Sequence, residues 1–279
     1  MIERLKKLAP GKITSYLILL FWTFLTIYPL YFTLISSLKT QSDMFSNIFG
    51  LPKKIQLANY TELFTQMKIQ TYVFNSLFIS TVTVFIQVII GAMASFILAR
   101  FAFKFKKLII IFFMVGILIP MQSVMIPIAL IAKSVNGYNS YIFMIACYVT
   151  FGIPYFVFVV TGFMKAIPKE IEEAAIIDGC SGGSLFWKII MPLSLPALST
   201  MAILSFFGAW NELILALVLL KRTAMKTISL GLINFAGDQF ANYPGQCAAV
   251  IISILPTLVI YLLLQENIIK GMTAGAVKG

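Results

Sequence analysis

The chain has 279 residues, of which 60% are apolar and 11% are charged, and its mean hydropathy is +0.95. A soluble domain is typically about 25% charged, so a water-facing globule cannot cover its surface with so few charges, and a soluble enzyme is excluded. The formal net charge is +11, and histidine is absent, which excludes histidine-ligated haem, the usual zinc sites and histidine proton relays. The composition predicts a polytopic membrane protein.

Six apolar stretches are long enough to cross a hydrocarbon core, which takes about 20 helical residues. They are residues 13–38, 69–99, 108–132, 134–164, 193–220 and 243–265. Lipid offers no partner to an unpaired backbone group, and the runs are too long for barrel strands, so we expect six transmembrane helices and an all-α fold. The first stretch follows four basic residues, as a signal peptide would, but it is too long for one and is expected to be retained.

Basic residues suggest an orientation in the membrane. The densest basic runs are residues 1–12 and 100–107, and placing both in the cytoplasm puts most of the 21 Lys and Arg there. The expected organisation is a cytoplasmic segment 1–12, a six-span domain 13–270 and a cytoplasmic tail 271–279, with an external loop 39–68 and a cytoplasmic loop 165–192. The net charge then reflects membrane topology, and no nucleic-acid-binding face is expected.

The positions of proline and cysteine indicate less about function than the apolar and basic segments do. Several spans are expected to be interrupted by proline, either as hinges around a pathway or as plain kinks, at Pro29, Pro120, Pro127, Pro154 and Pro256. No internal repeat is visible, which argues weakly against duplicated secondary transporters. The three cysteines, Cys147, Cys180 and Cys247, lie far apart without CxxC spacing, so neither a disulfide framework nor a metal site is expected.

The loop between spans four and five carries the clearest pattern. Pro168 suits the first turn of a short helix, and the acids that follow it suit a helix N-terminus. Gly179 stands where a left-handed cap would end that helix. A second short helix is expected over residues 184–191, with Pro192 ending it before span five.

The same loop contains the run Glu173-Ala174-Ala175-Ile176-Ile177-Asp178-Gly179, followed by Phe186, Ile189 and Pro192. This pattern resembles the EAA loop of ABC-importer permeases. Other segments resemble the carbohydrate permeases of the MalG type, a branch of the binding-protein-dependent (type I importer, MetI-like) inner-membrane permease family. They are Tyr28-Pro29-Leu30, Ser36-Ser37-Leu38-Lys39, Asn59-Tyr60, Asn75-Ser76-Leu77, Ile119-Pro120, Trp210-Asn211-Glu212 and the closing segment 271–279. One departure is Cys180, where the family usually has alanine.

The resemblance implies a permease subunit without its own ATPase, and the sequence has no GxxxxGK[ST] phosphate loop. It implies a second permease, as a probable heterodimer, two copies of a cytoplasmic ATPase that binds ATP and Mg²⁺, an external sugar-binding protein, and a bacterial plasma membrane. ATPase-coupling residues would be Glu172, Glu173, Ala174, Ala175, Asp178, Gly179, Phe186 and Pro192. The tail would contact the ATPase through Gly275, Lys278 and Gly279, although a frayed end is the alternative.

Glu212 is the one acid inside a predicted span, where an ionisable group is costly unless it faces protein or water. With Trp210, Asn211 and Asn75 it could line a sugar pathway, or it could hold two spans together by a hydrogen bond; both readings stay open. Other function classes fit the sequence less well. A secondary transporter or channel would need more membrane carboxylates or basic residues, a membrane redox enzyme would need haem ligands, and a permease for peptides, phosphate or amino acids is the nearest alternative.

Overall fold

The computed structural model describes residues 10–237 and 242–276, and every regular element among them is helical. The chain divides into two compact units. The first comprises Met1–Lys68 and Leu232–Ile254, and the second comprises Ile69–Gly231 and Leu255–Gly279. Four described helices are long and apolar enough to cross a membrane, and two bent helix pairs bring the number of possible spans up to six.

The first unit contains α2 (Pro10–Ser37), α3 (Gln41–Ser46) and α4 (Ala58–Thr65). The loop after α2 is fastened by its own polar side chains. Asn59 Nδ2 donates to the carbonyls of Ser37 (2.8 Å) and Lys39 (2.9 Å), and the Tyr60 hydroxyl lies 2.6 Å from Ser37 Oγ. The fully buried Lys39 donates from Nζ to two carbonyls between α3 and α4, those of Asn47 and Ile48. The segments Ser36–Lys39 and Asn59–Tyr60, which both supported the family resemblance, therefore bind each other.

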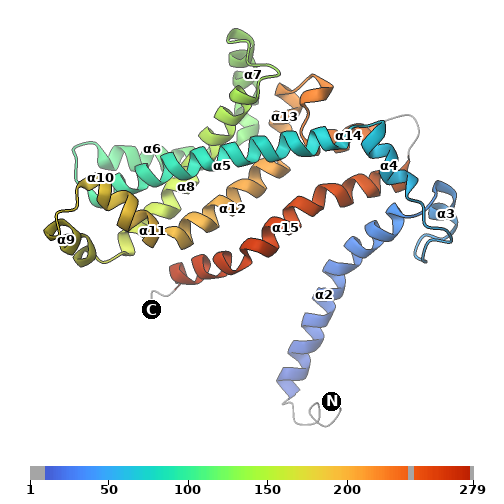
Figure 1. Cartoon of the computed structure of the whole chain (residues 1–279), viewed down its shortest axis with the longest axis horizontal. Helices are drawn as coiled ribbons and strands as arrows, with labels where there is room; N and C mark the ends of the chain where they lie inside the picture. The colour runs from blue at the N-terminus through green and yellow to red at the C-terminus, as the bar shows by residue number, and fades with distance from the viewer. Residues whose placement is uncertain (1–9, 238–241, 277–279) are drawn as a thin grey trace. The chain divides into compact units, whose positions relative to one another are not determined.

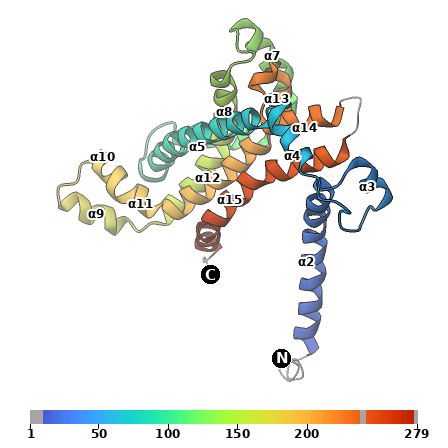
Figure 2. The same ribbon diagram turned by 45° about the vertical axis from the view of Figure 1, so that its right-hand side comes forward.

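The second unit is built on three long helices that lie side by side in Figures 1 and 2: α5 (Ile69–Arg100), α8 (Tyr141–Ala166) and α12 (Leu195–Asn211). A fourth helix, α6 (Lys106–Leu118), packs on α8. Small residues let these helices approach closely. A Cβ on Gly91 of α5 would stand 2.4 Å from the Phe156 ring, and one on Gly116 of α6 would stand 3.0 Å from Pro154.

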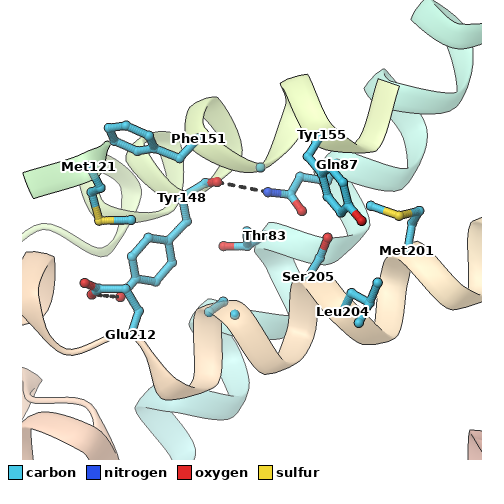
Figure 3. A pocket seen from close by; sticks show the side chains of 13 residues that line it. Thr83, Gln87, Met121, Tyr148, Phe151, Tyr155, Met201, Leu204, Ser205 and Glu212 are labelled. Carbon is cyan, nitrogen blue, oxygen red and sulfur yellow. Dashed lines mark hydrogen bonds between the residues drawn. The ribbon is translucent and has the colours of Figure 1, made fainter. Parts of the chain in front are cut away.

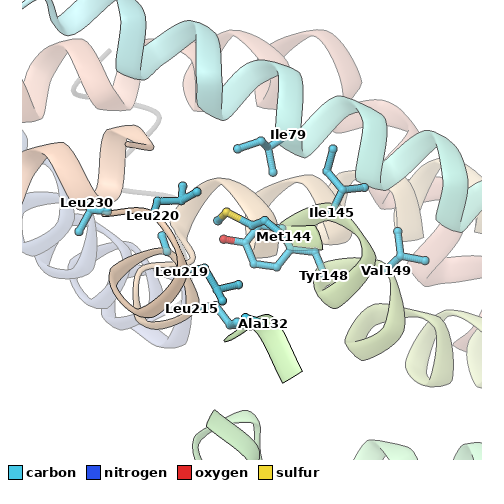
Figure 4. Packing of buried hydrophobic residues seen from close by; sticks show 11 residues of the cluster. Ile79, Ala132, Met144, Ile145, Tyr148, Val149, Leu215, Leu219, Leu220 and Leu230 are labelled. Carbon is cyan, nitrogen blue, oxygen red and sulfur yellow. The ribbon is translucent and has the colours of Figure 1, made fainter. Parts of the chain in front are cut away.

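Two clusters of buried side chains form the core of this unit. The cluster in Figure 4 joins α5, α8 and α13 (Ile214–Leu219), with Met144, Leu215 and Leu219 fully buried. The second cluster lies toward the other ends of the long helices. It joins α5, α8 and α12 to the short helices of the loop between α8 and α12, through Phe156, Met164, Phe186 and Ile190. That loop is therefore packed onto the helix bundle.

The third predicted span is not one straight helix, because the chain breaks within it. The third predicted span bends by 93° between α6 and the pair η1 (Met121–Val124) and α7 (Met125–Ser134). The break falls at Ile119–Pro120, because a residue before proline is pushed into an extended conformation, and Ile119 has ψ 112°. Of the five prolines expected to interrupt spans, Pro120 lies at a break between helices, whereas Pro29, Pro154 and Pro256 lie within continuous helices and Pro127 lies within α7.

Spans four and five also begin later than expected. Residues 135–140 form a turn, in which Asn136 and Asn139 have positive φ, so α8 starts at Tyr141. Span five starts at Leu195 and breaks again at Glu212 before α13. After α13 the chain continues through η3 (Thr223–Met225), α14 (Ile228–Gly237) and α15 (Tyr243–Ala276). The expected tail after Lys270 is thus helical through Ala276.

Candidate functional site: the helix between α8 and α12, and a mid-bundle cavity

The loop between α8 and α12 folds into four consecutive short elements: α9 (Lys169–Ile177), α10 (Gly182–Leu185), the π-helical turn η2 (Phe186–Ile190) and α11 (Met191–Leu193). The expectation that Pro192 ends the second helix is wrong. Pro192 lies inside α11, where a missing N–H is tolerated in the first turn, and the chain turns by 74° at Ser194 instead.

The end of α9 is fixed by the glycine that the sequence singled out. Gly179 has φ +84°, its N–H donates to the Ile176 carbonyl (3.0 Å), and the Cys180 N–H donates to the Ala175 carbonyl (2.9 Å). These two bonds form a Schellman motif, which needs a left-handed residue at the position of Gly179. The predicted left-handed cap is confirmed, and it ends α9 after two and a half turns.

The two faces of α9 differ sharply. Glu172 and Ala175, three residues apart, are 8% and 7% exposed, and Ala175 belongs to the second core cluster. The opposite face carries Glu170, Glu173, Ala174 and Ile177, at the spacing of one helical stripe, and all four are exposed. Helix α9 therefore presents one stripe to the bundle and another outward.

An ion pair anchors the inward face. Glu172 Oε1 contacts Arg100 Nε at the end of α5, and the two side chains are 11% and 7% exposed. The same guanidinium donates from Nη2 to the Ile167 carbonyl (2.9 Å), which lies just after α8. Arg100 thus joins α5, the end of α8 and α9. Breaking a buried pair of this kind is strongly destabilising, because the remaining charge is left without a partner.

A cavity of about 430 Å³ lies among α5, α8 and α12, and Figure 3 shows the side chains that line it. Its lining comes from α5, α8, α12 and the residues beside them: Thr83, Gln87, Met121, Tyr148, Phe151, Gly152, Tyr155, Met201, Leu204, Ser205, Gly208, Ala209 and Glu212. The volume falls in the range of small-molecule sites. Aromatic and apolar side chains predominate, with a few polar groups among them.

Glu212 closes one end of this cavity and caps α13. Its Oε1 accepts from the Leu215 N–H (2.7 Å), and its Oε2 accepts from the Ala216 N–H (3.2 Å) and the Tyr148 hydroxyl (2.7 Å). A carboxylate at a helix N-terminus satisfies free N–H groups and opposes the positive end of the helix dipole. Glu212 therefore lies at the break in span five and stabilises that break with its own side chain.

Comparison with known proteins identifies the family. Residues 87–274 match the family described as the inner membrane component of binding-protein-dependent transport systems. The chain belongs to this permease family. It is 36% identical over 265 residues to an ABC transporter permease protein of Caldicellulosiruptor sp. (strain Rt8B.4), covering 95% of this chain and 96% of that protein. It is also 35% identical to the trehalose transport system permease protein SugB of Mycobacterium tuberculosis (strain CDC 1551 / Oshkosh), covering 82% and 84% of the two chains.

The permease also shares its fold with a solved structure. A chain of a bacterial ABC transporter that imports the acidic polysaccharide alginate superposes with a TM-score of 0.81 at 19% identity, covering 92% of this chain and 95% of that one. The predicted all-α, type I importer fold is confirmed. The permease is a transport subunit and not an enzyme, as the sequence predicted.

The predicted coupling residues fall into two sets in the permease. Glu173, Ala174, Asp178, Gly179 and Pro192 are exposed. Glu172, Ala175 and Phe186 are buried within the subunit, where they hold α9 and η2 on the bundle. Of the predicted tail residues, Gly275 lies in α15, whereas Lys278 and Gly279 lie outside the described residues.

The predicted pathway residues are also divided. Glu212 lines the cavity, whereas Asn75, Trp210 and Asn211 are absent from its lining. Asn75 Nδ2 donates to the carbonyls of Ala224 (3.0 Å) and Lys226 (2.9 Å), so its amide holds the segment after α13. Trp210 is 2% exposed and stacks on Phe206 at 5.7 Å between ring centroids, and Asn211 is exposed.

The sequence reasoning missed the polar residues at the centre of the cavity, Thr83 and Gln87. The sequence of the second span nevertheless contains a pattern that indicates them. Its polar residues Ser76, Ser80, Thr83 and Gln87 recur every three or four positions, which places them on one helix face, and all four are buried. A polar stripe along an apolar span marks the side that faces other helices or a pathway.

Proposed function

We propose that this permease forms half of the transmembrane pathway for a sugar or oligosaccharide that an external solute-binding protein delivers. A separate ATPase drives alternating access through α9, the coupling helix. The family description supports dependence on a binding protein, and the trehalose permease supports a sugar substrate. A second permease subunit completes the pathway, and ATP and Mg²⁺ bind the ATPase partner rather than this chain.

The observation that carries this proposal is the outward stripe of α9. Ile177 on this stripe is 85% exposed, and its neighbour Ile176, which lies outside the stripe, is 58% exposed, on a helix of nine residues that already buries Glu172 and Ala175. Beside them stand Glu173, which can meet a basic or amide group, and Ala174, which lets another backbone come close. Exposed apolar side chains next to a charge and a small residue are what a protein partner covers.

The inward face of α9 explains how movement would reach the membrane. The Arg100–Glu172 pair and the packing of Ala175 against the second core cluster hold α9 on α5, α8 and α12. A helix held in this way transmits a rigid-body rotation, whereas a loosely attached loop would absorb it. Closure of the ATPase would therefore move the helices that line the cavity.

This function requires a defined topology. The α9 end of the bundle lies in the cytoplasm, with both chain termini on the same side and the 39–68 loop outside, in a bacterial inner membrane. The excess of Lys and Arg in residues 1–12 and 100–107 supports this orientation. In the assembled importer the closing segment 271–279 reaches the ATPase.

Co-purification combined with transport tests the proposal. The complex should contain an ATPase and a second permease, and proteoliposomes should take up sugar only with ATP and the binding protein. Ala174→Asp places a charge on the outward stripe and should abolish ATPase association or uptake with normal membrane insertion. Ala224→Asp is the matched control, because Ala224 is an exposed alanine in η3 whose carbonyl binds Asn75 near the start of α5, whereas α9 is held by Arg100 at the other end of α5. Full uptake in Ala174→Asp, or uptake without ATP, would contradict the proposal.

A further inference from the structure

The cavity contains hydrogen-bonding groups that the helix bundle does not use. Thr83 and Gln87 are 1% and 2% exposed, and Thr83 Oγ1 and Gln87 Oε1 have no hydrogen-bond partner among the described residues. Figure 3 shows both side chains between α5, α8 and α12, with Ser205 of α12 facing them. A buried polar atom without a partner is costly, so the pair marks a place where a ligand or water supplies the missing bonds.

The orientation of Gln87 is fixed by its surroundings. Its Nε2 donates to the Tyr148 carbonyl (2.9 Å), and because a carbonyl only accepts, the amide oxygen must be the atom left for the cavity. Gly152 makes room for this arrangement, since a Cβ there would lie 2.0 Å from Nε2. The amide oxygen is therefore a preset acceptor at the middle of the bundle.

The remaining lining narrows the chemistry of the ligand. The lining combines the unpaired acceptor Gln87 Oε1 and the Glu212 carboxylate with the hydroxyls of Thr83, Tyr155 and Ser205, which can donate or accept. The thirteen lining residues that the structure describes include no lysine or arginine. A ligand with several hydroxyl donors and no negative charge fits this set. The rings of Tyr148, Phe151 and Tyr155 offer apolar faces of the kind against which the C–H face of a sugar packs.

We propose that this subunit itself contacts the transported solute, a neutral carbohydrate, and that Gln87 Oε1 and Thr83 Oγ1 accept hydrogen bonds from its hydroxyl groups half-way across the membrane. This inference rests on the proposed function. It adds which residues of this subunit contact the substrate and that the substrate is uncharged. An acidic saccharide, such as the alginate carried by the structural relative, would meet Glu212 without a compensating cation.

The test uses the intact importer, with its second permease, ATPase and binding protein, in proteoliposomes. Uptake of radiolabelled trehalose, maltotriose, diacetylchitobiose and an alginate trisaccharide is measured together with ATP hydrolysis. Gln87→Leu and Thr83→Val remove the two acceptors at similar volume. Ser80→Ala is the matched control, because Ser80 is also a buried, unpartnered polar residue of α5 but does not line the cavity.

If the complex carries a neutral sugar, each of the two cavity variants should take it up about fivefold more slowly than the native complex, since one hydrogen bond contributes about 1 kcal/mol and 1.4 kcal/mol corresponds to a factor of ten. ATP hydrolysis stimulated by the binding protein should stay unchanged, so less sugar moves per ATP, and Ser80→Ala should behave as the native complex. Native uptake in both cavity variants, or preferred uptake of the alginate trisaccharide, would overturn this inference alone. A native complex without ATP-dependent uptake of any of these sugars would overturn the proposed function, and this inference with it.

Discussion

Replacing Glu172 by Gln should release α9 from the bundle. The substitution keeps the shape of the side chain but leaves the Arg100 guanidinium without a counter-charge, at a site where the two side chains are 7% and 11% exposed. Removing one partner of a buried pair costs about 3–5 kcal/mol. Because Arg100 keeps its bond to the Ile167 carbonyl, we take the lower value, about 3 kcal/mol, as the loss in the free energy that holds α9 in place.

At about 1.4 kcal/mol per factor of ten, this loss raises the population of undocked α9 on the order of 100-fold. Hydrogen exchange of peptides covering residues 165–185 in the purified complex measures that population directly. Glu170→Gln is the matched control, because Glu170 lies on the exposed face of the same helix, and it should change exchange little. The double variant Arg100→Met with Glu172→Met should lose less than the sum of the single changes. Native protection in Glu172→Gln would refute the anchoring role of the pair.

Three further predictions concern the loop, the cavity and the tail. Gly179→Asp should weaken ATPase association in pull-down assays, whereas Gly179→Asn, which tolerates positive φ without adding charge, should retain it; equal binding by both variants would contradict the contact. Tyr148→Phe removes a donor to the Glu212 carboxylate and should cost about 1.5–3 kcal/mol, seen as a lower melting temperature of the purified subunit; an unchanged melting temperature would show that this bond does not stabilise the bundle. Deleting residues 271–279 should lower coupled ATP hydrolysis without preventing insertion, and unchanged hydrolysis would leave the tail without a role in coupling.

The sequence predicts the long apolar helices and the end of α9 well, because both depend on local chemistry. About 20 apolar residues in a row have few alternatives in lipid, and a glycine after a short amphipathic run is the usual site of a left-handed cap. The α5 bounds, Ile69–Arg100, differ by one residue from those expected, and Gly179 has the expected positive φ.

Helix breaks are predicted less well, because proline alone does not decide them. Pro154 continues α8 without interruption and packs against Gly116, whereas Pro120 coincides with a bend of 93°. The break at Glu212 has no proline. It forms where a carboxylate can cap the next helix and accept from Tyr148, a residue 64 positions away, and such a contact is not visible in local sequence.

Roles of single residues within the site are the hardest to predict. Glu172 and Glu173 are adjacent acids in one motif, yet one is paired with Arg100 and the other is exposed, because successive residues of a helix point about 100° apart. Gln87 was not singled out, since its importance depends on its bond to the Tyr148 carbonyl and on the space left by Gly152. Asn75, which was singled out, binds two carbonyls instead of facing the cavity.

The central claim is that the outward stripe of α9 touches a nucleotide-hydrolysing subunit. Photo-crosslinking tests it most directly, with p-benzoylphenylalanine in place of Glu173 in the purified complex and, as the control, in place of Ala224 in η3. The account predicts that residue 173 crosslinks to the ATPase and that residue 224 does not. Residue 173 crosslinking only to lipid or to nothing, in a complex that still hydrolyses ATP, would contradict it.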